Sequence, residues 1–317
     1  MGSLIRIEDI EAAADTVAGQ TIRTPTVHSP GLTALLGVPV ALKLELLQRS
    51  GSFKARGVVT KIASLTSEER HAGLVAVSGG NHAVAVADGA GSLGIAATVV
   101  MPRFAPARSV EMAEAAGADV RLTPDIPEAF ALTTRLQAEG KTLVHPFDDP
   151  AVIAGQGTVG LELARDTPYE LTDVLVSVGG GGLISGVATA VRALLPNTRV
   201  WGVETVGAEA MSAALRAGGP TPVTLSSIVA SLSAPSASQL TYDHVRELVH
   251  DLVVVTDDDA VRGCGELAEH AKVWAEPAAG CLISAAREVL ARVEDARLGL
   301  VICGGNAAIA DIAPRLT

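Results

Sequence analysis

Short runs of Val, Ile and Leu alternate with Ala-rich stretches of helical spacing along most of the chain. Continuous apolar strands that alternate with helices are typical of a parallel sheet covered by helices on both faces. We therefore predict an α/β fold with mostly parallel sheets. The predicted strands span residues 40–46, 74–78, 96–101, 174–178, 199–204, 252–255 and 298–303.

The chain is predicted to pass from one domain to another at two places, near residues 65–67 and at residues 145–150. The segment between them has its own alternation of strands and helices. A chain of 317 residues with 48% hydrophobic content can bury one large core or two smaller ones. We predict a small domain of residues 66–145, inserted into a large domain of residues 1–65 plus 146–317, with a site in the cleft.

The charge and cysteine content restrict the partners. A net charge of -11 argues against nucleic acid and anionic membrane, and favours a small-molecule substrate. No apolar run is long enough to span a bilayer, and the N-terminus lacks the core of a signal peptide. Cys264, Cys281 and Cys303 are too widely spaced for a zinc pattern and suggest no disulfide framework, so we expect a cytoplasmic protein.

A single lysine, Lys54, stands between a glycine-marked turn and the predicted start of a helix, in Ser-Gly-Ser-Phe-Lys-Ala-Arg-Gly at residues 50–57. Most lysines are solvated surface charges. Here the neighbours, Phe53 included, carry few other charges, and a partly desolvated lysine is a usable nucleophile and base. Such an amine can form an imine with an aldehyde cofactor.

Four consecutive glycines, Gly179, Gly180, Gly181 and Gly182, follow an apolar strand and precede Leu183, where a helical pattern begins. Several backbone N–H groups and a helix N-terminus would meet an anion there. The alternative is a flexible strand–helix turn, which does not need four glycines. The spacing matches neither a Walker loop nor a dinucleotide fingerprint, which disfavours ATP and NAD.

A second glycine turn, formed by Ser78, Gly79, Gly80, Asn81 and His82, also follows a strand and opens a helix. It predicts a second anion site, suited to a substrate carboxylate. Ordinary helix capping is the alternative, and it is compatible with substrate binding. His82 is either a catalytic base or, as we favour, a hydrogen-bonded support behind the turn.

The strand that ends at Cys303 leads into Gly304, Gly305 and Asn306. A small polar residue there would face the nitrogen of a heterocycle, although a buried structural cysteine is the ordinary interpretation. The run of Asp257, Asp258 and Asp259 is better explained as a helix N-terminus than as a metal site. Together, the lysine and the glycine turns suggest pyridoxal 5'-phosphate (PLP) chemistry on an amino acid.

At this point the chain resembles the serine/threonine dehydratase and serine racemase family of fold-type II PLP enzymes, whose architecture is that of the tryptophan synthase β chain. The matching motifs run in the family's order along nearly the whole chain. They are Leu42-Lys43-Leu44-Glu45, Gln48, residues 50–57, Ser78 with Gly80-Asn81-His82-Ala83, Gly155-Gln156-Gly157-Thr158 with Glu162, the four glycines, Glu276-Pro277 and Cys303-Gly304-Gly305-Asn306.

The resemblance implies a role for each site residue. Lys54 would carry PLP as an imine, next to Phe53, and the backbone of residues 179–183 would hold the phosphate. Asn81 would bind the ring hydroxyl, and Cys303 would face the pyridine nitrogen. Residues 78–82 would hold the substrate carboxylate. A thiol beside the nitrogen, rather than a carboxylate, favours rapid expulsion of a leaving group.

The activity that the resemblance implies is α,β-elimination from L-threonine, L-serine or a related β-hydroxy amino acid. Lys54 would remove the α-proton, the β-hydroxyl would leave, and the product would hydrolyse to a 2-oxo acid and ammonia. Relatives are often dimers, so a homo-oligomer is expected.

The chain departs from the family at several positions. The racemases have a serine where this chain has Gly79, so efficient racemisation is not expected. Cation-binding members have a carboxylate six residues after the position of Glu204, where this chain has Ala210, so no metal is assigned. A loop that usually reads Ala-Asp-Gly is Val-Ala-Ser at residues 229–231, which leaves the substrate side chain open.

Two alternatives remain beside elimination. One is a PLP-dependent β- or γ-replacement enzyme of the cysteine synthase or threonine synthase type. The other is a non-catalytic PLP-binding protein.

Overall fold

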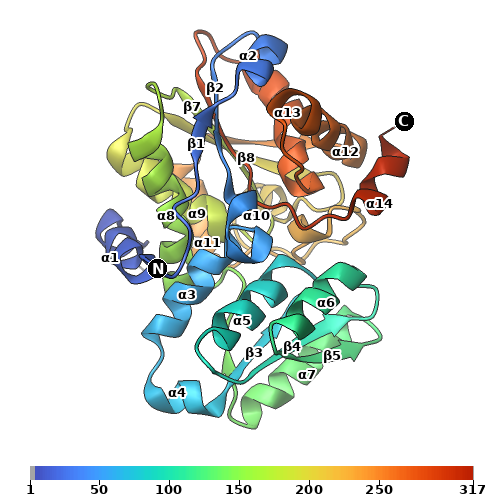
Figure 1. Cartoon of the computed structure of the whole chain (residues 1–317). Helices are drawn as coiled ribbons and strands as arrows, with labels where there is room; N and C mark the ends of the chain where they lie inside the picture. The colour runs from blue at the N-terminus through green and yellow to red at the C-terminus, as the bar shows by residue number, and fades with distance from the viewer. Residues whose placement is uncertain (1–3, 317) are drawn as a thin grey trace.

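A computed structural model describes residues 4–316 of the chain. Two sheets form its framework, and Figure 1 shows the smaller one with its helices below the larger one. The larger sheet has the strand order β1-β2-β10-β7-β8-β9, and the smaller one β5-β4-β3-β6. All strand pairs are parallel except β1 with β2, which confirms the predicted α/β class.

The strands of the larger sheet are β1 (Thr26–His28), β2 (Val40–Lys43), β7 (Asp173–Ser177), β8 (Arg199–Thr205), β9 (Asp251–Val255) and β10 (Leu298–Val301). Those of the smaller sheet are β3 (Leu74–Val77), β4 (Ala97–Pro102), β5 (Asp119–Thr123) and β6 (Thr142–Leu143). All seven predicted strands are present with slightly different ends. The largest difference is in β2, which ends at Lys43 because a 3-10 turn begins at Glu45.

The helices before the four-glycine turn are α1 (Ile7–Val17), α2 (Pro30–Leu36), α3 (Lys54–Ser64), α4 (Ser67–Ala72), α5 (Asn81–Gly91), α6 (Ala107–Ala115), α7 (Ile126–Ala138) and α8 (Pro150–Asp166). Those after it are α9 (Gly182–Leu194), α10 (Ala210–Ala217), α11 (Gln239–Leu248), α12 (Asp257–Glu266), α13 (Pro277–Leu290) and α14 (Ile309–Ile312). None of the helices among residues 4–316 has both the length and the apolar composition needed to cross a membrane.

The two central strands of the smaller sheet, β3 and β4, are covered on both faces, as their uninterrupted apolar sequences predict. Leu74 and Ala76 of β3 point into one core with residues of α3, α5 and α6. Val75 and Val77, which alternate with them along the strand, point to the other face and pack with residues of α7. Alternate residues of one strand therefore contact helices on opposite sides of the sheet.

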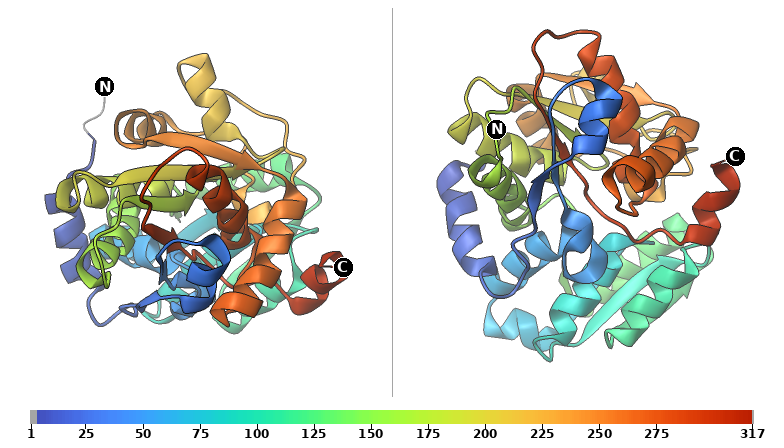
Figure 2. Two further views of the ribbon diagram at one scale, coloured as in Figure 1. Left: turned by 90° about the horizontal axis from the view of Figure 1, so that it is seen from above. Right: turned by 45° about the horizontal axis from the view of Figure 1, so that its top comes forward.

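In the larger sheet, β7, β8 and β9 follow each other in one direction, and the chain then returns to β10 on the other side of β7. Because parallel crossovers are right-handed, this reversal places α8 and α9 on one face and α12 and α13 on the other (Figures 1 and 2). The carboxyl ends of β7 and β10 meet at this reversal.

The helix ends follow local sequence signals. Thr256 caps α12, and Asp259 completes a reciprocal capping box with it. The Asp run at residues 257–259 is therefore a helix N-terminus, as the sequence predicted. The division into domains of residues 66–145 and 1–65 plus 146–317 stays a proposal, which the two separate sheets support. Helix α3 contributes Val58 and Ile62 to the core of the smaller sheet, so it contacts both units.

Candidate functional site

A cleft of about 510 Å³ lies where the two sheets face each other. Every predicted site residue lines it, and several follow the carboxyl ends of β3, β7 and β10. Parallel α/β sheets usually bind ligands at this edge. The predicted residues in the lining are Phe53, Lys54, Ser78, Gly79, Gly80, Asn81, His82, Gly179, Gly180, Gly181, Gly182, Leu183 and Cys303.

Lys54 is the first residue of α3, and its Nζ donates a hydrogen bond to the carbonyl oxygen of Pro146, at 2.8 Å. The Nζ lies 5.1 Å from the centre of the Phe53 ring. Burial lowers the pKa of Lys54 to about 8, although the nearby Cys303 and Glu276 act in the opposite direction. The amine therefore loses its proton more easily than an exposed lysine, as nucleophilic attack requires.

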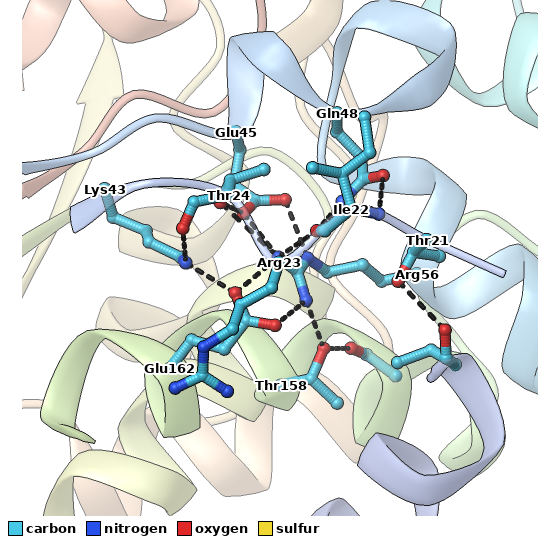
Figure 3. Close-up of polar contacts among 12 residues, drawn as sticks. Thr21, Ile22, Arg23, Thr24, Lys43, Glu45, Gln48, Arg56, Thr158 and Glu162 are labelled. Carbon is cyan, nitrogen blue, oxygen red and sulfur yellow. Dashed lines mark hydrogen bonds and ion pairs between the residues drawn. The ribbon is translucent and has the colours of Figure 1, made fainter. Parts of the chain in front are cut away.

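A buried ion cluster of Lys43, Glu45, Arg56 and Glu162 fixes the helix that carries Lys54 (Figure 3). Arg56, two residues after Lys54, donates to Glu45 from Nε at 2.8 Å and to Glu162 from Nη1 at 2.7 Å. Lys43 donates to the same Glu162 at 2.5 Å. Because the two positive and two negative charges balance, the cluster can stay buried.

The four-glycine turn is held by close packing. Gly181 has φ +91°, a conformation that side chains rarely adopt, and it immediately precedes α9. A Cβ on Gly180 would lie 2.1 Å from Cδ1 of Phe147. Among residues 4–316, the amide groups of Gly179, Gly180 and Gly181 have no hydrogen-bond acceptor. These free N–H groups at a helix N-terminus are a suitable site for a phosphate.

The second glycine turn leads from β3 into α5. The N–H of Gly80 donates to the Oγ of Ser78 at 3.2 Å, and no side chain caps α5. His82 is buried, and its Nε2 lies 2.8 Å from the carbonyl oxygen of Val144. Burial and the neighbouring Lys54 lower the pKa of His82 to about 3. His82 is therefore neutral and hydrogen-bonded, and its role as a support behind the turn stays a prediction.

Asn81 is held by a residue to which the sequence assigned no role. Its Nδ2 donates to both carboxylate oxygens of Glu276, at 2.8 and 3.0 Å, and its Oδ1 accepts from Asn306 at 2.8 Å. Glu276 lines the cleft, and burial raises its pKa despite the hydrogen bond from Asn81. The only signal was the Glu-Pro pair, which is also typical of an ordinary helix start.

Cys303 lies two residues after the end of β10 and lines the cleft. Burial, reinforced by Glu276, raises the pKa of its thiol well above the ordinary value, so the sulfur stays protonated. The backbone N–H of Phe53 donates to the Cys303 carbonyl at 3.0 Å, which ties the lysine turn to this strand.

Glu204 caps α10 rather than facing an open site. Its carboxylate accepts hydrogen bonds from the N–H of Met211 at 2.8 Å and from the N–H and Oγ of Ser212 at 3.0 and 2.5 Å. Within residues 4–316, no group of three or more His, Cys, Asp or Glu side chains could hold a metal ion.

Comparison with known proteins gives consistent matches over most of the chain. The family model described as "Pyridoxal-phosphate dependent enzyme" matches residues 17–304. The L-threonine ammonia-lyase of Thermotoga maritima is 41% identical over 306 residues, which are 96% of this chain and 76% of that protein. The phenylserine dehydratase of Ralstonia pickettii is 38% identical over 296 residues, 92% of this chain and 90% of that protein.

Among solved structures, maize serine racemase superposes with a TM-score of 0.91 at 35% sequence identity. The match covers 98% of this chain and 97% of that one.

Proposed function

The chain belongs to the family of pyridoxal-phosphate-dependent enzymes, and we propose that its cleft eliminates the β-hydroxyl of L-threonine, L-serine or a related β-hydroxy amino acid. The matches to the ammonia-lyase, the dehydratase and the racemase confirm the expected resemblance, and with it the fold-type II architecture. The observation that carries the proposal is the position of Lys54, whose partly deprotonated amine faces the same cleft as the free amides of the glycine turn.

The residues present fit PLP at both ends. Lys54 would attach it, and the free amides of Gly179, Gly180 and Gly181 would hold its phosphate at the N-terminus of α9. Asn81 and Cys303 would contact the ring. When bound, PLP supplies an aldehyde for the amine and an electron-withdrawing ring that acidifies the α-proton of an amino acid.

Lys54 is the base that we propose for removal of the α-proton. With a pKa of about 8, roughly a tenth of the Lys54 amines are neutral at pH 7. The amine can then accept the α-proton as a general base. The turn at residues 78–82 would bind the carboxylate at the N-terminus of α5, which orients the Cα–H bond. The neutral thiol of Cys303 cannot supply the counter-charge that a carboxylate would give the ring nitrogen.

Elimination is favoured over racemisation by position 79. Removing and returning a proton on both faces of Cα needs a second acid–base group opposite the lysine. Gly79 lines the cleft where the racemases have a serine, and it has no side chain. We therefore propose that racemisation is at most a side reaction.

The test is a panel of β-hydroxy amino acids given to the purified holoenzyme, with ammonia and the 2-oxo acid measured for each. We expect both products in equal amounts, without added sulfide or phosphate co-substrates. Lys54→Ala should lose the cofactor absorbance band and turnover together. Lys61→Ala, on the same helix, is the matched control and should keep both. Full activity of Lys54→Ala would overturn the assignment.

We also propose a homodimer in the cytoplasm. Free, buried cysteines at positions 264, 281 and 303 are compatible with a reducing compartment. Light scattering on the purified holoenzyme would measure the oligomeric state, and a monomeric mass would contradict the dimer.

A further inference from the structure

All four phenylalanines of the chain line the same cleft. The sequence contains only four, and they are Phe53, Phe104, Phe130 and Phe147. Neither the two tyrosines nor the two tryptophans take part in the lining. In a chain with 3% aromatic residues, this concentration at one cavity marks where large apolar surface is available to a ligand.

The four rings fall into two groups. Phe53 precedes Lys54, and Phe147 packs on the four-glycine turn, so both lie beside the proposed cofactor site. Phe104 and Phe130 come from the smaller sheet's side of the cleft, and they are 68% and 44% exposed. A third exposed apolar side chain, Ile228, lines the cleft from the larger unit and is 42% exposed.

We call this outer part of the lining the apolar wall, which consists of Phe104, Ile126, Phe130, Ile228, Val229 and Ala230. It includes no charged side chain. Lys54 and the glycine turns serve the cofactor and the carboxylate, and Glu276 holds Asn81. The other two Asp, Glu, Lys or Arg side chains of the lining, Asp311 and Arg315, are exposed and lie outside the wall, in the C-terminal segment. The substituent on the β-carbon is the part of the substrate left to meet the wall.

We propose that the apolar wall is a subsite for a large apolar β-substituent, so that the preferred substrate is a β-hydroxy amino acid with an aryl or branched alkyl group on Cβ. This inference rests on the proposed function and goes beyond it in naming the substrate class. The net reaction converts R–CH(OH)–CH(NH₃⁺)–COO⁻ into R–CH₂–CO–COO⁻ and NH₄⁺. The Cα–H, Cβ–O and Cα–N bonds break, and a Cβ–H bond and the Cα=O bond form. One water leaves with the β-hydroxyl and one is consumed in hydrolysis, so no oxidant or reductant is needed.

The physical basis is the solvent exposure of the largest side chains of the wall, Phe104, Phe130 and Ile228, whereas Val229 is buried. Large apolar side chains that line a cavity and contact water bind an apolar group favourably, because both surfaces leave water. Serine and threonine carry only hydrogen or a methyl group on Cβ, which covers little of this surface. A single additional methylene in a hydrophobic pocket changes specificity by roughly 10–200-fold.

The first measurement compares kcat/KM of the holoenzyme for L-threo-3-phenylserine and L-threonine. We expect at least about a tenfold preference for phenylserine. Phe130→Ser and Phe104→Ser should each lower kcat/KM for phenylserine more than for threonine, and so reduce this preference. Leu93→Ser is the matched control, because Leu93 is 51% exposed and lies outside the cleft lining.

The second measurement is binding without turnover. L-Phenylalanine and L-alanine differ in the apolar β-substituent, and neither has a hydroxyl that can leave. Calorimetry on the holoenzyme should show at least about tenfold tighter binding of phenylalanine, and Phe130→Ser should remove most of the difference.

Equal affinities for phenylalanine and alanine, or equal losses for both substrates in Phe104→Ser and Phe130→Ser, would overturn the subsite. If threonine were converted and phenylserine were not, the proposed function would stand and the subsite would fail. If neither released ammonia, the proposed function would fail, and the calorimetric comparison would still decide whether the wall binds apolar groups.

Discussion

The side-chain amide of Asn81 donates hydrogen bonds to both carboxylate oxygens of Glu276. Asn81 begins α5, which covers the smaller sheet, and Glu276 immediately precedes α13, which covers the larger one. The contact therefore connects the two sides of the cleft at the residue proposed to hold the cofactor ring.

Replacing Glu276 by glutamine should weaken cofactor binding. The variant keeps the size of the side chain but replaces one of the two oxygens that accept from Asn81 by an NH₂ donor. Leaving a buried donor without its acceptor costs about 1–3 kcal/mol, so we expect the dissociation constant for PLP to rise by about 5- to 150-fold. Absorbance titration of the apoprotein measures it.

The matched control is Glu288→Gln, on the helix that follows Glu276, because the Glu288 carboxylate pairs with Arg292 at the surface. It should bind PLP like the unchanged protein. Unaltered affinity in Glu276→Gln would show that Asn81 is positioned without this carboxylate.

The rate at which the apoprotein takes up PLP should depend on the protonation of Lys54. Only the neutral amine attacks an aldehyde. Because burial lowers the pKa of this lysine from 10.5 to about 8, the rate should rise with pH and level off above about 8 to 9. Stopped-flow absorbance between pH 6 and pH 10.5 follows the reaction. A rate that still rose steeply beyond pH 10 would mean that the amine is not desolvated.

A serine at position 79 should introduce racemisation. A Cβ on Gly79 would meet no atom closer than 3.5 Å, and its φ does not lie in the left-handed region, so Gly79→Ser should fold normally. The new hydroxyl would line the cleft as a second acid–base group. We expect solvent deuterium to enter recovered substrate and D-amino acid to appear, with elimination reduced. Chiral chromatography of recovered serine checks this. The comparison variant is Gly80→Ser. A Cβ on Gly80 would meet no atom within 4 Å, so this variant adds the same hydroxyl at the neighbouring position, just before α5.

The sequence predicted the elements and residues whose signals are local. Each predicted apolar run is a strand, and each glycine turn stands where a strand ends. Because the strands are parallel, the glycine turns lie at the same edge and line one cleft. β5 was missed because its edge position leaves Asp119, Arg121 and Leu122 exposed, which removes the apolar pattern. β6 has only two residues.

Contacts between distant segments could not be predicted in the same way. Asn81 and Glu276 are 195 positions apart, and Arg56 and Glu162 are 106 apart. No spacing rule connects such pairs, so the sequence alone could not predict that they are in contact. The apolar wall likewise combines six residues from three separate segments, and only their position in space reveals it.

The buried ion cluster should respond strongly to the loss of one member. Arg56→Met removes the positive charge between Glu45 and Glu162 and leaves both carboxylates in the interior. Breaking a buried pair in this way costs about 3–5 kcal/mol. We expect that loss in the free energy of unfolding from denaturant titration of the holoenzyme.

Arg165→Met is the matched control, because Arg165 pairs with Glu11 at 3.2 Å and both side chains are about half exposed. Removing such a surface pair should change stability by about 1 kcal/mol or less. Similar losses in the two variants would contradict the view that this cluster anchors the lysine helix.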